Sequence, residues 1–200
     1  MGFFDMFKGE PQPISNELKE KIIFMLSDKL LSSMNGIIKN DFIDNFEINT
    51  ENKEELGKEM LYLTVFYADY CWYNLRDNPF SDSELYEIMG DVLNITIAKY
   101  FTHLGKINSI QDISNPNIHE EADELRETFK SRRKEYNQDL NTTEGLISFG
   151  MSLNSNIRNA LDLDFGDDNS SKVGEISPRI TEHLSSNLAE FLYENIRPLR

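Results

Sequence analysis

The sequence predicts an all-α protein, a single-domain irregular bundle of about six helices in which the second and third helices are central. Three observations support this prediction. Apolar residues recur at steps of three and four through most of the chain, as on one face of an amphipathic helix. Capping residues and helix breakers separate the periodic segments. The spacing of these segments shows no constant period, which disfavours a helical-repeat solenoid.

The apolar periodicity and the capping signals together place the helices along the chain. They are expected at about residues 15–36, 53–76, 81–104, 117–140, 143–163 and 177–196. Ser81 and Glu84 have the spacing of a capping box, and Gly105 suits the left-handed position that ends a helix. Ser177 and Pro178 supply a cap and a first-turn proline for the last helix. Residues 164–175 are therefore expected to form a polar loop, and residues 37–50 to be mostly irregular.

The second helix is expected at the centre of the bundle. Residues 60–75 are apolar on nearly all sides of a helix, so other helices must surround it. The third helix is also apolar on more than one face, which predicts that it forms a buried hairpin with the second. Residues 117–140 carry only a narrow apolar seam, so the fourth helix should lie outside.

The charge of the chain limits its choice of partners. The formal net charge is −15, from 35 acidic and 20 basic residues. This charge repels nucleic acid and favours a basic protein partner, although it also simply keeps a protein in solution.

The single cysteine, Cys71, excludes an internal disulfide. Without a membrane-spanning stretch or a secretory signal in the sequence, we expect a cytoplasmic location. Frequent Asn, Ile and Lys and scarce Ala suggest a bacterial source.

The first 13 residues are distinct from the helical domain expected over residues 14–200. Phe3, Phe4 and Phe7 crowd this apolar N-terminal tail, and Gly9, Pro11 and Pro13 then stop any helix. Three interpretations remain open. In order of preference, the tail packs on its own domain, contacts a partner protein, or touches a membrane surface.

A dense basic run within the fourth helix is a second candidate for binding a partner. Lys130, Arg133 and Lys134 lie close together on a helix, which could hold a phosphate or an acidic peptide. Acidic residues at 120–127 precede them on the same helix. Intrahelical charge pairing is therefore an equally good explanation of the run.

Asp69 interrupts the aromatic run of the second helix. It shares a helix face with Tyr73 and Arg76, at steps of four and seven. An unpaired buried carboxylate costs several kcal/mol, so Asp69 must find a partner or take up a proton. Arg76 or a tyrosine hydroxyl could supply that partner. The three residues are a candidate polar spot in a pocket between helices, with a structural ion pair as the alternative.

Carboxylates at helical spacing suggest a second class of function. Glu84, Glu87 and Asp91 share one helix face. All-α nucleotide pyrophosphohydrolases hold Mg²⁺ with Glu-x-x-Glu on one helix and Glu-x-x-Asp on the next. Glu121-x-x-Glu124 resembles the first half of this pattern, whereas Glu135 and Asp139 are one residue too far apart for the second. In so acidic a chain, a solvated charged face also explains this spacing.

The remaining chemistry-bearing residues carry no recognisable signature. The three histidines, His103, His119 and His183, lack a second ligand at zinc spacing, and no phosphate-binding glycine loop or nucleophile motif is present. Arg179 and His183 do share one helix face. We expect no cofactor and no bound metal. The sequence thus favours a non-enzymatic acidic module that binds a protein and acts as an antagonist or complex subunit. The alternative is a metal-dependent nucleotide phosphohydrolase.

Overall fold

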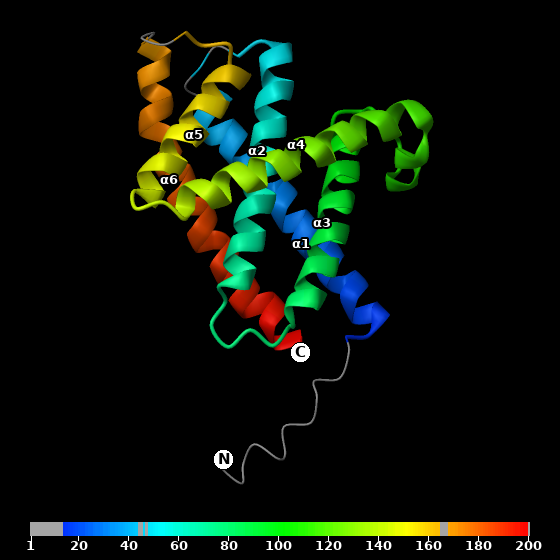
Figure 1. The fold of residues 1–200 in the computed structure, drawn as a ribbon. Helices are drawn as coiled ribbons and strands as arrows, with labels where there is room; N and C mark the ends of the chain where they lie inside the picture. The colour runs from blue at the N-terminus through cyan, green and yellow to red at the C-terminus, as the bar shows by residue number, and fades with distance from the viewer. Residues whose placement is uncertain (1–13, 44–45, 47, 165–167, 200) are drawn as a thin grey trace.

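The protein is an all-α bundle, as predicted. A computed structural model describes residues 14–43, 46, 48–164 and 168–199. Over these residues it contains six α-helices and no β-strand (Figure 1). The helices are α1 (Asn16–Ile37), α2 (Thr50–Tyr73), α3 (Asp82–His103), α4 (Pro116–Leu140), α5 (Gly145–Ala160) and α6 (Asp168–Phe191). Short π- and 3₁₀-helical turns follow as η2 (Ile38–Ile43), η3 (Ile110–Ser114), η4 (Leu192–Ile196) and η5 (Arg197–Leu199).

Local capping sets most of the helix ends. The Ser15 hydroxyl accepts a hydrogen bond from the backbone of α1, and Ser81 forms the predicted capping box with Glu84 at the start of α3. Asn115 caps α4 ahead of Pro116. Gly105 has a φ of 71°. Glycine adopts this left-handed conformation more readily than other residues, because it has no side chain. These signals are local, so the sequence revealed them.

α2 is the central helix. It contacts each of the other five α-helices, and it crosses the middle of the molecule in Figure 1. Nearly every side chain from its second turn to Asp69 is buried. Burial on all sides explains why this segment shows no polar face in sequence.

α3 also lies inside, between α1, α2 and α4, but its largest contact is with α1. The predicted hairpin of α2 and α3 is therefore not the main packing of α3. α4 runs across the outside of α2 and α3 and then turns into α5, its main neighbour (Figure 1). Only four of its residues are buried, which agrees with the narrow seam: Ala122, Leu125, Phe129 and Tyr136.

An aromatic cluster joins α2, α4 and α5. The Tyr136 ring lies 5.2 Å from Phe66 and 5.0 Å from Phe149, both edge to face, measured between ring centroids. Phe66 and Phe149 stack at 5.9 Å. The Asn156 amide donates a hydrogen bond of 3.2 Å to the Tyr136 hydroxyl, which satisfies that buried group. This cluster anchors one half of α4 on the bundle.

The polar loop predicted over residues 164–175 is wrong over most of its length, because α6 begins at Asp168. Pro178 lies inside α6 rather than in its first turn. Val173 and Ile176 extend the buried stripe of α6 towards its N-terminus, so core packing offsets the cost of an internal proline. The residue four before Pro178 is Gly174, which leaves room beside the carbonyl that the proline ring crowds.

The segment between α1 and α2 is also more regular than predicted. α1 continues into the π-helical η2, where Phe42 is buried and stacks on Phe46 at a centroid distance of 5.8 Å. The side chain of Asn49 caps α2, so the helix starts three residues before the predicted position. The helix also ends three residues earlier than predicted. Arg76, expected on the second helix, follows its end.

Candidate functional site

A small apolar cleft between α2, α3 and α4 brings together two of the predicted sites. Its volume is about 180 Å³. α2 contributes Asp69 from the predicted pocket, and α4 contributes Lys130 and Arg133 from the basic run. Apolar and small residues form the rest of the lining: Val65, Tyr86, Met89, Gly90, Leu93 and Phe129. Of the three residues of the predicted polar spot, Asp69 lines this cleft, whereas Tyr73 and Arg76 do not.

Asp69 forms an ion pair with Arg133, with 2.6 Å between its carboxylate oxygen and the guanidinium nitrogen. The Asp69 side chain is 9% exposed, and that of Arg133 is 35% exposed. Burial raises the pKa of the Asp69 carboxyl, and Arg133 opposes this shift. Arg76, one of the candidate partners considered for Asp69, does not pair with it. Arg76 lies beyond the end of α2, and its side chain is 94% exposed.

Arg133 retains hydrogen-bonding capacity beside the cleft. Its Nε atom is buried, and within the described part of the chain it has no hydrogen-bond partner. A buried donor without an acceptor costs about 1–3 kcal/mol. This nitrogen is closed off from solvent, so a bound group could reach Arg133 only through the exposed part of its side chain.

Two tyrosines from different helices stand near the ion pair. Tyr86 lines the cleft and is 70% exposed, an unusual exposure for so large a ring. Tyr73 is partly exposed, and its hydroxyl lies 3.5 Å from the backbone carbonyl of Asp82. Burial and the nearby charge of Asp69 raise the pKa of Tyr73. Tyr73 is therefore close enough to interact electrostatically with Asp69, although it does not line the cleft.

The basic run divides into residues with different roles. Lys130 pairs with Glu127 one turn earlier, as the intrahelical alternative predicted, yet it also lines the cleft. Lys134 is exposed on α4. Arg132, which sequence reasoning did not select, lies 2.7 Å from the carboxylate of Glu59 on α2.

Two adjacent arginines of α4 thus reach two buried carboxylates of α2. Glu59 and Asp69 are ten residues apart, which corresponds to about 15 Å along a helix. Burial raises the pKa of Glu59, and Arg132 opposes this shift. The two ion pairs fix the point at which α4 crosses α2, and with it the width of the cleft. A polar residue interrupting an apolar helix was the only sequence signal, and it did not identify the partners.

Several carboxylates of the metal hypothesis have other partners. Glu84 serves the capping box and also accepts a hydrogen bond from the backbone of Ile14. Glu87 and Asp91 both pair with Lys19, at 2.6 and 2.8 Å. Glu121 pairs with Lys106. In the described ranges, no group of three or more His, Cys, Asp and Glu side chains is arranged to hold a metal ion.

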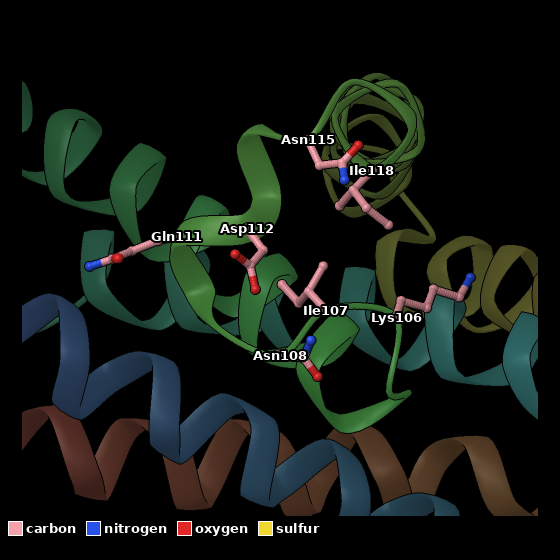
Figure 2. Close-up of a pocket in the computed structure, with 7 residues that line it drawn as sticks. All are labelled: Lys106, Ile107, Asn108, Gln111, Asp112, Asn115 and Ile118. Atoms are coloured by element: carbon pink, nitrogen blue, oxygen red, sulfur yellow. The ribbon is translucent and has the colours of Figure 1, made fainter.

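A second cavity, of about 420 Å³, lies where the end of α3, η3 and the start of α4 meet (Figure 2). Its polar groups serve the local structure. The Asp112 carboxylate accepts from the backbone of Ser109 in a capping box. Figure 2 shows the Lys106 side chain extending away from Asp112, and its ammonium contacts Glu54 at 2.6 Å and Glu121. This cavity is therefore a weaker candidate for a binding site than the cleft.

The three phenylalanines of the tail, Phe3, Phe4 and Phe7, lie outside the described residues. Among the residues that are described, none of the helices combines the length and hydropathy needed to cross a bilayer. No protein-family model, no curated protein and no solved structure matches this chain. The geometry of the cleft is therefore the basis on which a function can be argued.

Proposed function

We propose that this protein is a non-enzymatic protein-binding module whose cleft between α2, α3 and α4 accepts an apolar side chain from an acidic segment of a partner. The observation that carries the proposal is the apolar cleft itself, bordered by the Asp69–Arg133 ion pair and by Lys130. Interfaces gain most of their affinity from a few anchors that fill such depressions.

The size of the cleft favours a side chain over a small molecule. Its volume of about 180 Å³ falls below the range of roughly 300–1,000 Å³ usual for small-molecule sites. One aromatic or branched apolar side chain is a better match. The exposed ring of Tyr86 would cover such an anchor and lose its own contact with water.

The local charge favours an acidic segment next to that anchor. Lys130, Arg133 and Lys134 place three cations along one stretch of α4, against the two carboxylates that pair with them, Glu127 and Asp69, so one positive charge is left over there. A partner carboxylate would gain charge-assisted hydrogen bonds there. The net charge of −15 favours basic residues elsewhere on the partner, away from the cleft. The absence of cysteine pairs favours action in a reducing compartment, the cytoplasm of a bacterium.

Gly90 provides a sharp test, because it lines the cleft and a Cβ added there meets nothing within 4 Å. Gly90→Leu should occupy part of the cleft, because there is open space around its Cβ, and should favour the helical state of α3. The full-length protein would be used to select binders from a random peptide library. We expect enriched peptides to carry an apolar residue beside Asp or Glu, and to bind Gly90→Leu at least about tenfold more weakly.

Gly150→Leu on α5 is the matched control. Gly150 is also helical, has open space around its Cβ position and does not line the cleft. It should retain binding. Peptides that bind wild type and Gly90→Leu equally well, or a selection that enriches no such motif, would show that this cleft is not a docking site.

A further inference from the structure

A polar cavity on another face of the bundle holds cations that the proposed function does not use. Its volume is about 490 Å³, and α1, η2 and α6 line it. On α6 the lining residues Arg179, His183 and Asn187 follow one another at steps of four, so they share one helix face. Lys29 faces them from α1.

The cations of this cavity lack carboxylate partners. Across residues 14–43, 46, 48–164 and 168–199, neither Lys29 nor Arg179 forms an ion pair. The Lys29 ammonium instead lies over the ring of Phe191, 5.8 Å from its centroid, and a ring does not neutralise its charge. Asp41 is the one carboxylate among the lining residues. Two permanent cations therefore oppose one carboxylate, in a chain whose net charge is −15.

Other polar groups surround these cations. The Asn187 amide nitrogen lies 2.9 Å from Nε2 and 3.0 Å from Nδ1 of His183, which holds the imidazole beside the cavity. Ser32 and Ser33 of α1 also line the cavity and carry hydroxyl groups. Arginine, lysine and hydroxyl donors together offer more hydrogen bonds than the two oxygens of a carboxylate accept. A phosphate group, with three strong acceptor oxygens, matches such a donor set.

We propose that this cavity binds the phosphate group of a small phosphorylated molecule, with Arg179 and Lys29 as its cationic contacts. The volume lies within the range of small-molecule sites and exceeds what a phosphate group alone requires. The proposal is independent of the peptide-binding cleft, because the two cavities share no lining residue.

Histidine-ring NMR of the full-length protein can test the proposal with inorganic phosphate as the probe. The chain has three histidines, and His103 and His119 do not line the cavity, so they serve as internal references. We expect phosphate to shift the His183 ring signals saturably at concentrations up to roughly 10 mM, while the reference signals stay in place. Sodium chloride at matched ionic strength should produce no such shift.

Two variants should weaken or abolish this response. Arg179→Gln, at an exposed position, should weaken phosphate binding at least about tenfold. Gly36→Leu should fill the cavity, because Gly36 lines it and a Cβ added there meets nothing within 4 Å. Arg76→Gln is the matched control, since the Arg76 side chain is 94% exposed and does not line the cavity. A His183 response that is absent in wild type, is undiminished in Arg179→Gln, or is reproduced by chloride would overturn the proposal.

Discussion

At the scale of single residues, the main feature is the pair of carboxylates that α2 carries into an apolar environment. Glu59 and Asp69 are buried, and each is neutralised by an arginine of α4. A buried ion pair is weak evidence of stability, because removing charges from water costs about as much as their attraction returns. Removing only one member leaves the other buried and unpaired. The two ion pairs therefore determine the position of α4 on α2 more than they add to the stability of the fold.

The pairing of Asp69 predicts a destabilisation that depends on pH. Arg133→Met should lower the free energy of unfolding by about 2 kcal/mol at about pH 7, less than for a fully buried pair because Arg133 keeps contact with solvent. A carboxyl whose folded pKa is raised favours folding below its unfolded pKa and loses that contribution as pH rises through the folded pKa. The deficit should therefore be smaller at a second, lower pH, because a lower pH favours the protonated, uncharged form of Asp69.

Urea denaturation of wild type and variant at the two pH values measures this deficit. Asp69→Asn should cost less than Arg133→Met, because the charge that it leaves unpaired, on Arg133, keeps contact with solvent. Arg76→Met, at a side chain that is 94% exposed, should leave stability unchanged. A deficit in Arg133→Met that is independent of pH would contradict the role assigned to Asp69.

At the scale of helices, close approach and open space distinguish glycines that look alike in sequence. Gly57 in α2 faces the buried Tyr100 of α3, and a Cβ added to Gly57 would lie 2.6 Å from the Tyr100 hydroxyl oxygen. That hydroxyl donates a hydrogen bond of 3.1 Å to the backbone carbonyl of Glu54. Gly90 in α3 has no such neighbour. The first glycine permits two helices to meet, and the second leaves a cleft open.

Two alanine substitutions should therefore act in opposite directions. Gly57→Ala should lower the free energy of unfolding by about 1–3 kcal/mol, because the new methyl group displaces Tyr100 from its hydrogen bond. Gly90→Ala should raise it by about 0.5–1 kcal/mol through helix propensity alone. Thermal and urea denaturation report both changes. Equal effects of the two substitutions would mean that helix propensity, and not the contact with Tyr100, governs position 57.

At the scale of the whole molecule, buried tyrosine hydroxyls make the stability of the bundle depend on pH. Burial raises the pKa of four tyrosines that lie on α2, α3 and α4: Tyr62, Tyr67, Tyr100 and Tyr136. Such groups favour the folded state fully below their unfolded pKa of about 10, and that contribution is lost as pH rises through the folded pKa. Alkaline conditions therefore act on all three helices at once.

We expect cooperative unfolding at alkaline pH, with the buried tyrosines ionising only as the helices unfold. Ultraviolet absorbance of tyrosinate and far-ultraviolet circular dichroism, followed on the same sample, show whether ionisation of these tyrosines coincides with the loss of helix. A single phase of ionisation with helicity retained throughout would contradict the burial of the four phenols.

The sequence alone determined the all-α class, most helix ends and the centrality of α2, because caps and apolar stripes act within a few residues of one another. Ser81, Gly105 and Pro116 are such local signals. It also marked Asp69 as a polar position within the core. The upstream stripe of α6, with Val173 and Ile176 at helical spacing, was visible too, but the proline signal outweighed it.

Only the tertiary structure decided which side chains from distant helices meet. The distance from Asp69 to Arg133 along the chain is 64 residues, and no local pattern encodes their pairing. The same holds for the two cavities, which exist because side chains on separate helices leave space unfilled where the helices cross. The ion pair and the cavities depend on how the helices cross one another. The packing of the whole core sets these crossings, and the chemistry of neighbouring residues in the sequence does not specify them.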